Sequence, residues 1–373
     1  MKILIIGMAD SIHLAKWLSQ YSDSNFLFQI VSSSPHRRIH PTLRGLLRKP
    51  NFKMGRFSRA LSLFLWILDR VLSNFLRGLI VAFTIRSFKP DIVHVLEFQN
   101  AGYVFLRSRR FIGNASKFKL VLTPYGSDIF WFQHYPKHLR KIRKLLSIAD
   151  GISCECRRDE LLAIEHGFKG ILLPRIPAFG STELPELDPD RTKRRIIAVK
   201  GYQNKWGQAT LALQAISSVA DDLVGFNVEI FSAEGKAVRS ARKLEKHTGI
   251  QVKIHKKHSM SNQDVLELFS RSQVYIGLSK SDGISASMIE AMAQGAIPIQ
   301  SNSSCCDEWL DDEIGGFLVD YQDVEKVANL ILRIVSDEEF QISAARHNQS
   351  LLRKKIAAPL TKKAALDTYN LLN

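Results

Sequence analysis

The chain has 373 residues, of which 45% are hydrophobic and 24% are charged. A single hydrophobic core stops growing well before this length, so we expect a soluble protein of two domains rather than a disordered chain or a repeat array. The formal net charge of +16 attracts phosphate groups, whether on nucleotides, nucleic acid or anionic lipid.

The ends and the cysteines exclude several further classes. The start, Met1–Gly7, is too short for the apolar core of a signal peptide and is expected to form a buried strand. The four cysteines, at positions 154, 156, 305 and 306, lack zinc-ligand spacing and are too few for a disulfide scaffold. No stretch reaches the roughly 18 uncharged apolar residues of a membrane span. We therefore expect a cytoplasmic protein.

The first half of the chain alternates strand and helix signals. Apolar runs predict strands at Lys2–Ile6, Phe28–Val31, Asp91–Val95, Leu120–Thr123 and Gly151–Cys154. Helical periodicity predicts a helix capped by Asp10 and Ser11, a long helix over Phe57–Phe88, and a basic helix over Lys137–Ile148. Such alternation is typical of a parallel sheet covered by helices on both faces.

A linker is expected at residues 181–191, because this segment carries prolines and clustered acids without periodicity. It separates an N-terminal domain, residues 1–180, from a C-terminal domain, residues 192–358. The last residues, 359–373, are expected to form a helix that packs back on the N-terminal domain.

The alternation resumes after the linker. Strands are expected at Ile196–Val199, Asn227–Phe231, Val252–His255, Val274–Leu278 and Ile297–Gln300. Helices are expected at Gln208–Val219, Lys236–Lys246, Asn262–Ser270 and Ser287–Gln294. The predicted fold class is α/β, with two Rossmann-like doubly wound parallel-sheet domains that face a cleft.

One strand-to-helix passage, Ser279–Pro298, carries the strongest functional signal. Small residues at Gly283, Ser285 and Ala286 allow a ligand to approach the backbone closely. The unpaired amides at the start of the predicted helix, including those of Ile284 and Ser285, favour a bound diphosphate.

Two carboxylates, Asp282 and Glu290, flank the start of that helix eight positions apart. They are placed to hold hydroxyls on two parts of one ligand, with Glu290 toward a ribose. From the spacing alone, a capped helix with a solvated Glu290 is an equally good interpretation.

This passage resembles the E-x7-E region of retaining GT-B glycosyltransferases of family four, which has the form S-x-x-E-G-F-x-x-x-x-x-E-A-M-A-x-G-x-P. The resemblance implies a GT-B fold and a nucleoside-diphosphate sugar as donor. Asp282 stands where the family has its first Glu, so the side chain there is one methylene shorter. The resemblance is specific in this passage and weaker over the rest of the chain.

In such enzymes an Arg after the first strand of the second domain, and a Lys a few residues later, hold the diphosphate. Lys200 occupies the position of that Arg and Lys205 that of the Lys. Lysine lacks the two-pronged guanidinium of arginine, so the first replacement is not neutral.

In the N-terminal domain, Thr123–Ile129 is similar to the H-G-x-D loop of these enzymes, with Tyr125 where the family often has His. Asp128, Gly126 and Ser127 are therefore candidate sugar contacts. Five further residues lie after predicted strands and are candidates for the acceptor side: Asp10, Ser11, His13, Glu97 and Gln99. The alternative without a functional role is that His13 lies on an ordinary helix face and that Glu97 and Gln99 lie in an ordinary loop.

Other signals are set aside. Gly7 begins no G-x-G-x-x-G, which argues against a dehydrogenase. No metal site is expected, because the D-x-D of Asp188–Asp190 falls in the linker. The basic patches lack the aromatic spacing of a nucleic-acid module. Residues 24–68 contain no aspartate or glutamate but many arginines and lysines. An anionic membrane surface is therefore a further expected partner.

The sequence thus predicts a retaining glycosyltransferase that needs no cofactor and moves a sugar from a nucleotide sugar to a hydroxyl acceptor. We expect the acceptor to be a glycan or lipid-linked glycan of cell-surface polysaccharide synthesis. Two alternatives remain open at this point. One is a nucleotide-sugar 2-epimerase, and the other is a weakly active membrane-surface scaffold of the same fold.

Overall fold

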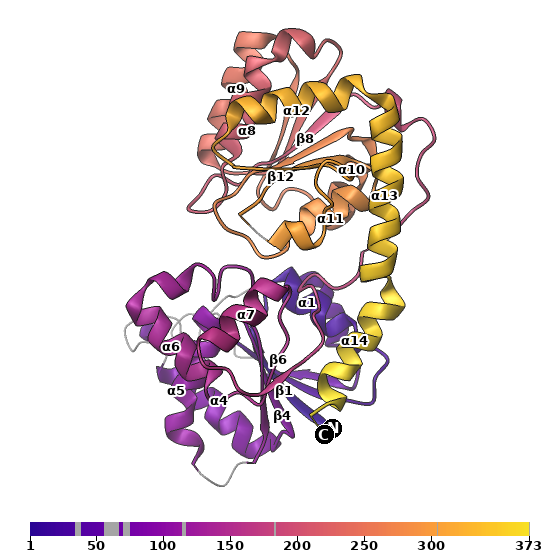
Figure 1. Cartoon of the computed structure of the whole chain (residues 1–373). Coiled ribbons are helices and arrows are strands. Elements are labelled where there is room, and N and C mark those ends of the chain that lie inside the picture. Colours follow the sequence, from indigo (N-terminus) through magenta and orange to yellow (C-terminus); the bar gives the residue numbers. More distant parts are fainter. Residues whose placement is uncertain are drawn as a thin grey trace. The chain divides into compact units, whose positions relative to one another are not determined.

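A computed structural model describes the chain in the ranges 1–33, 39–55, 67–69, 75–113, 117–182, 184–303 and 305–372. The chain divides into two compact units (Figure 1). Unit 1 consists of Met1–Ser181 together with Ala358–Asn373, and unit 2 consists of Thr182–Ala357.

Unit 1 is built on a parallel sheet whose described strands follow the order β3-β2-β1-β4-β5-β6-β7. The strands are β1 (Lys2–Gly7), β2 (Leu27–Ser32), β3 (Phe52–Met54), β4 (Ile92–Leu96), β5 (Lys119–Thr123), β6 (Gly151–Ile152) and β7 (Ile171–Leu172). The short edge strands β3 and β7 were not expected from the sequence, because three or fewer residues give no periodic signal.

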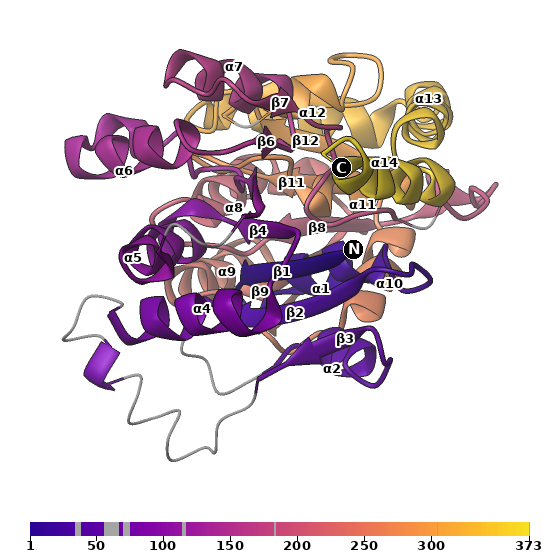
Figure 2. The same ribbon diagram turned by 90° about the horizontal axis from the view of Figure 1, so that it is seen from below.

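Helices cover both faces of this sheet (Figures 1 and 2). One face carries α1 (Ile12–Ser19), α2 (Pro41–Leu46) and α14 (Ala358–Asn370). The other carries α4 (Phe75–Phe88), α5 (Tyr103–Ile112), α6 (Pro136–Leu146) and α7 (Arg157–Glu165). The earlier part of the long helix expected over Phe57–Phe88 lies mostly outside the described residues.

The uninterrupted apolar run of β1 explains why helices are needed on both sides. Ile3 and Ile5 are buried in the cluster beneath α1 and α14, whereas Leu4 and Ile6 are buried beneath α4 and α5. Successive side chains of a strand point to opposite faces, so a strand without polar positions is stable only when both faces are covered.

The C-terminal helix α14 packs on unit 1. The hydroxyl of Tyr21 donates to the carbonyl of Ala365 at 2.9 Å, and the hydroxyl of Tyr369 lies 2.8 Å from Nδ1 of His94. The end of the chain therefore completes the core of the unit in which the chain begins.

Unit 2 repeats the design with a parallel sheet of order β10-β9-β8-β11-β12-β13 among its described strands. These are β8 (Ile196–Lys200), β9 (Asn227–Ala233), β10 (Val252–Lys256), β11 (Val274–Gly277), β12 (Ile297–Ser301) and β13 (Phe317–Val319). Its helices are α8 (Ala209–Ser218), α9 (Gly235–Thr248), α10 (Asn262–Arg271), α11 (Ala286–Ala293), α12 (Val324–Ser336) and α13 (Glu338–Ile356).

Short helical turns join these elements: η1 (Phe98–Gly102), η2 (Phe132–His134), η3 (Arg191–Lys193), η4 (Ala220–Asp222) and η5 (Cys305–Glu308). No helix in the described ranges is both long and apolar enough to cross a membrane.

Both sheets have the doubly wound arrangement expected from the sequence, and that prediction is confirmed. The strand order reverses between β1 and β4 in unit 1, and between β8 and β11 in unit 2. Crevices at such reversal points, beyond the carboxyl ends of the strands, are where doubly wound sheets bind ligands. We therefore expect the functional site in the loops that follow these four strands.

Candidate functional site

In unit 2, Lys200 and Asp282, which both differ from the glycosyltransferase pattern, meet at the strand reversal. Lys200 ends β8 and Asp282 follows β11, and the Lys200 Nζ lies 3.1 Å from the Asp282 Oδ2. The same ammonium donates to the Ser285 Oγ at 3.3 Å. One cation thus ties the end of β8 to the loop that opens α11.

The charge of Lys200 is held in place by this pairing. Burial lowers the pKa of the ammonium, but the Asp282 carboxylate, its hydrogen bond and the nearby Tyr275 and Tyr202 together raise it by more, so the net pKa lies well above the usual lysine value. The raised pKa favours the cationic form of Lys200.

The loop before α11 ends in a serine at the N-cap position. Ser285 is the N-cap residue, but its hydroxyl makes no capping bond. Asp282 lies before this N-cap position, and its Oδ1 accepts from the amide of Gly283 at 2.9 Å. Because Ser285 holds the N-cap position, the plain interpretation of Asp282 as the helix cap is wrong. At the other end of the helix, Gly295 has a φ of 84°, the left-handed conformation expected there.

Tyr275 supports this loop from inside the sheet. Its hydroxyl lies 2.9 Å from the Ser287 Oγ and 3.5 Å from the Ser285 Oγ. A Cβ at Gly277 would lie 2.5 Å from this hydroxyl and 2.5 Å from the Oε1 of Gln300, so only glycine leaves room for the arrangement. Sequence analysis missed Tyr275, because a buried strand residue looks like any other core position.

The loop that carries Lys205 is joined to the loop after β11 by backbone hydrogen bonds. The amide of Lys280 donates to the carbonyl of Trp206 at 2.8 Å, and the amide of Gln208 donates to the carbonyl of Leu278 at 2.9 Å. Lys205 itself is exposed, with its Nζ 4.8 Å from the centre of the Trp206 ring. The structure thus places Lys205 in a loop adjoining the one that leads to Asp282.

A second carboxylate, Glu234, holds the same loop from its other side. It accepts from the backbone amide of Gln203 at 3.2 Å, from the side chain of Asn204 at 3.0 Å and from Lys257 Nζ at 2.6 Å. Burial alone raises the pKa of Glu234, but these bonds, mainly that with Lys257, lower it on balance. Glu234 was not anticipated, since its partners are distant in sequence.

Glu290 lies on α11 and is only 7% exposed, so the interpretation of a solvated surface residue is wrong. Its Oε1 accepts a hydrogen bond of 3.2 Å from the Nδ2 of Asn262, the first residue of α10. Asn262 was missed, although it follows β10 and so lies at the same edge of the sheet as Lys200.

In unit 1, Glu97 is buried and has a left-handed φ of 70°. Its carboxylate accepts from the amides of Asn100 and Ala101 and so caps η1. Burial raises its pKa above the usual glutamate value despite these bonds. The plain alternative of a structural loop residue accounts for these contacts, and contact of Glu97 with an acceptor stays a prediction.

Asp128 is also buried, and its Oδ2 accepts from the amides of Phe98 and Tyr125, each at 2.8 Å. Burial raises the pKa of Asp128 well above the usual value, and the nearby Glu97 raises it further. Gln99 donates from its side chain to the carbonyl of Asp128 at 3.0 Å. The candidate loops after β4 and β5 are thus bonded to each other.

Gly126 is fixed by two side chains that sequence analysis did not identify. Its amide donates to Glu155 at 3.4 Å, and its carbonyl accepts from Arg158 at 3.0 Å. Glu155 also accepts from the amide of Ala178 at 2.7 Å. Both residues come shortly after β6, so the strand-end rule would have found them.

The remaining candidates of unit 1 lie after β1 and β5. Ser11 caps α1 by accepting from the amide of His13 at 3.1 Å. The rings of His13 and Tyr125 are 5.6 Å apart. Burial and the surrounding carboxylates raise the pKa of Tyr125 well above its usual value. Asp10 precedes α1, and Ser127 lies in the Tyr125–Asp128 loop.

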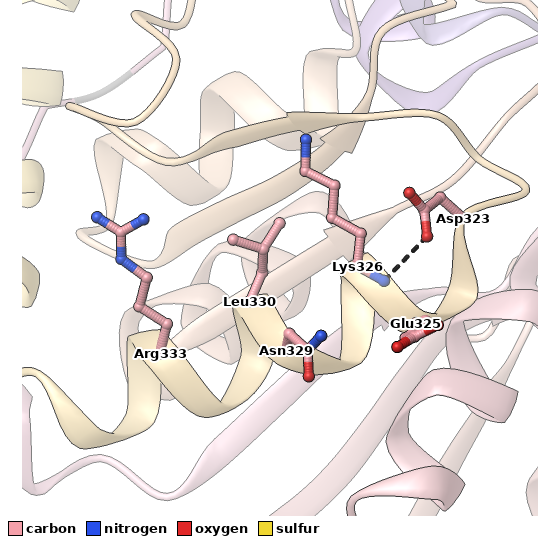
Figure 3. Close-up of a pocket in the computed structure, with 6 residues that line it drawn as sticks. All are labelled: Asp323, Glu325, Lys326, Asn329, Leu330 and Arg333. Carbon is pink, nitrogen blue, oxygen red and sulfur yellow. Dashed lines mark hydrogen bonds between the residues drawn. The ribbon is translucent and has the colours of Figure 1, made fainter.

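A shallow depression on α12 is separate from these residues (Figure 3). Its lining consists of Asp323, Glu325, Lys326, Asn329, Leu330 and Arg333. Asp323 accepts from the amide of Lys326 at 3.0 Å and so caps the helix. It contains none of the candidate residues, and we assign it no role.

Comparison with known proteins gives the class of each unit. Residues 182–350 match the family model described as Glycosyl transferases group 1. Residues 2–152 match the model described as Glycosyl transferase 4-like. Among curated protein sequences, none matches this chain significantly.

Solved structures similar over the whole length define the fold. HepE of Anabaena, crystallised with UDP-glucose, has a TM-score of 0.73 at 14% identity, with 100% of both chains covered. Sucrose-phosphate synthase of Thermosynechococcus elongatus has a TM-score of 0.74 at 14% identity, covering 100% of this chain and 99% of its own. The lipopolysaccharide outer core galactosyltransferase WaaB has a TM-score of 0.70 at 12% identity, with 100% of both chains covered.

The chain therefore has the GT-B fold, and both of its units match models of glycosyltransferase domains.

Proposed function

We propose that this protein transfers a sugar from a nucleoside-diphosphate sugar to a hydroxyl acceptor, with retention at the anomeric carbon. The observation that carries the proposal is the contact of Lys200 with Asp282 and Ser285 at the start of α11. It brings positive charge to a helix N-terminus at the strand reversal, within the segment that matches the Glycosyl transferases group 1 model.

The donor would bind with its diphosphate at the start of α11. When the bond between the anomeric carbon and the diphosphate oxygen breaks, negative charge develops on that oxygen. Lys200, Lys205 and the amides of Ile284 and Ser285 supply positive charge from the chain itself, so the proposed step uses no metal ion or other cofactor.

The two acidic residues would orient the donor. Glu290, held by Asn262, is proposed to accept from ribose hydroxyls, and Asp282, held by Lys200, from the transferred sugar. The acceptor oxygen would then bond to the anomeric carbon on the face that the diphosphate leaves. Its proton would pass to the departing diphosphate, which balances the reaction.

We propose that the loops of unit 1 bind the acceptor. Asp128, Tyr125, Gly126, Ser127, Glu97, Gln99 and the Asp10–His13 segment follow the carboxyl ends of β1, β4 and β5. The acceptor is proposed to be a glycan or a lipid-linked glycan, and the similar fold of a lipopolysaccharide galactosyltransferase supports this choice of acceptor. The protein is proposed to act in the cytoplasm.

The test is a thermal-shift screen against nucleotide sugars, followed by product analysis with the donor that binds. A ligand that binds only the folded state raises the melting temperature. We expect one nucleotide sugar to stabilise wild type and to be transferred to a hydroxyl acceptor. Lys205→Ala should cost about 2–4 kcal/mol in transition-state stabilisation.

Three outcomes would contradict the proposal. An isomerised sugar released without acceptor would indicate an epimerase. Donor binding without turnover on any acceptor would indicate a scaffold. A product with the inverted anomeric configuration, detected by NMR, would exclude retention.

A further inference from the structure

Helices α4, α5 and α6 of unit 1 pack on the same face of its sheet (Figure 2). The rings of Phe75 on α4 and Phe111 on α5 lie 5.3 Å apart, edge to face. The hydroxyl of Tyr103 on α5 lies 2.8 Å from Nδ1 of His138 on α6. We call the solvent side of α4, α5 and α6 the basic-apolar face.

The charge on this face has one sign. None of the three helices contains an aspartate or glutamate. Their exposed charged residues are Arg86, Arg109, Arg110, Lys137, Arg140, Lys141, Arg143 and Lys144. On α6, the opposite side buries Ile142, Leu145 and Leu146, so the cations are fixed outward by the packing.

The same face exposes large apolar side chains. On α4, Phe75, Leu79 and Phe83 are 38%, 37% and 72% exposed. They follow each other at intervals of four residues, so they lie along one side of the helix. Tyr135, just before α6, is 42% exposed. Exposed apolar side chains in a row are unusual for a surface that only meets water.

We propose that the basic-apolar face docks on the surface of an anionic lipid bilayer. Each lysine or arginine close to such a surface contributes about 1 kcal/mol, and apolar side chains of an adjacent helix enter the boundary between headgroups and acyl chains. Duplex nucleic acid would satisfy the cations but would leave Phe83 and Leu79 in water. The combination of one-sign charge with an apolar row therefore favours the bilayer.

This surface is separate from the basic segment at residues 24–68 that first suggested membrane contact, part of which lies outside the described residues. It is also made of residues that we have not placed in the donor or acceptor sites. The inference therefore goes beyond the proposed sugar transfer and does not depend on it.

The experiment is co-sedimentation of the full chain with vesicles. We expect binding to vesicles of phosphatidylcholine with phosphatidylglycerol, little binding to phosphatidylcholine alone, and weakening at high salt. Arg140→Glu combined with Lys144→Glu should reduce the partition coefficient at least about 30-fold, from two lost contacts and added repulsion. The matched control, Lys236→Glu with Lys243→Glu on the exposed side of α9, should bind as wild type.

A second variant tests the apolar row. Phe83→Ser leaves the charge unchanged and removes a side chain that is mostly in water, so folding should be preserved. We expect weaker binding to anionic vesicles than that of wild type at the same salt concentration, and wild-type binding by this variant would contradict a role for the apolar row. Equal binding to both vesicle types, or equal loss in the α9 control, would overturn the proposal. So would binding to duplex DNA that anionic vesicles fail to displace.

Discussion

The Lys200 ammonium lies 3.1 Å from the Asp282 carboxylate, although the two residues are 82 positions apart in the sequence. At both of these positions the chain departs from the glycosyltransferase pattern that it resembles. Their contact suggests that the departures compensate each other, since a shorter acid and a compact ammonium meet where the motif has a glutamate and a guanidinium.

This coupling can be measured with a double-mutant cycle of Lys200→Arg and Asp282→Glu. Because the side chains touch, we expect each single change to lower kcat/KM and the double variant to recover part of the loss. The expected interaction energy is about 1–3 kcal/mol, the range for contacting residues. Purely additive effects would show that the contact has no functional weight.

Glu290 offers a second test, through its hydrogen bond with Asn262. Glu290→Gln keeps the size of the side chain but removes the charge, so donor affinity measured by calorimetry should fall by about 1.5–3 kcal/mol. The melting temperature without donor should change little, because the new amide still presents an oxygen to Asn262.

Glu267→Gln makes the same chemical change at an exposed position on α10 and serves as the control. It should bind the donor as wild type does. If Glu290→Gln also binds normally, the ribose contact assigned to Glu290 is wrong.

Asp128 distinguishes a structural carboxyl group from one that contacts substrate. Asp128→Asn keeps an oxygen that accepts from the amides of Phe98 and Tyr125, whereas Asp128→Ala leaves both amides unpaired. We expect Asp128→Ala to lose about 1–3 kcal/mol of stability for each amide. Denaturant unfolding of the two variants measures the difference.

The raised pKa of Asp128 adds a pH dependence to this comparison. A carboxyl group whose folded pKa lies above its unfolded value contributes stability below the unfolded pKa and loses it as pH rises through the folded pKa. Asp128→Asn should therefore match wild type in acid and exceed it at neutral pH. If it folds well but transfers sugar slowly, the carboxylate is needed for substrate.

Strand ends were the part of the fold that the sequence predicted best, because an apolar run followed by small polar residues is a local signal. This signal located the loop of Asp282 and the start of α11, whereas Lys200 was singled out through the resemblance to the glycosyltransferase family. Tyr275 was not identified, because its role depends on partners brought together only by the folded sheet. Glu155 and Asn262 follow strands β6 and β10, so the strand-end rule would have pointed to both. Short elements such as β3 and β13 were missed for a different reason, since three residues carry no period.

His94 provides the last prediction, because its environment has a clear electrostatic consequence. The ring is fully buried between the hydroxyls of Tyr369 and Thr123, each at 2.8 Å, and burial lowers its pKa from 6.5 to about 3. Below pH 6.5 the unfolded chain takes up a proton that folded His94 does not. Stability should therefore fall by about 1.4 kcal/mol per pH unit between pH 6.5 and 3, and be unaffected above it.

The contribution of His94 is isolated by comparing the pH dependence of unfolding in wild type and in His94→Gln. The variant has no proton to take up at this position, so its curve should be less steep below pH 6.5 and parallel to wild type above it. His134→Gln removes an exposed histidine and should keep the wild-type slope. Parallel curves for wild type and His94→Gln over the acid range would mean that His94 is protonated in the folded protein.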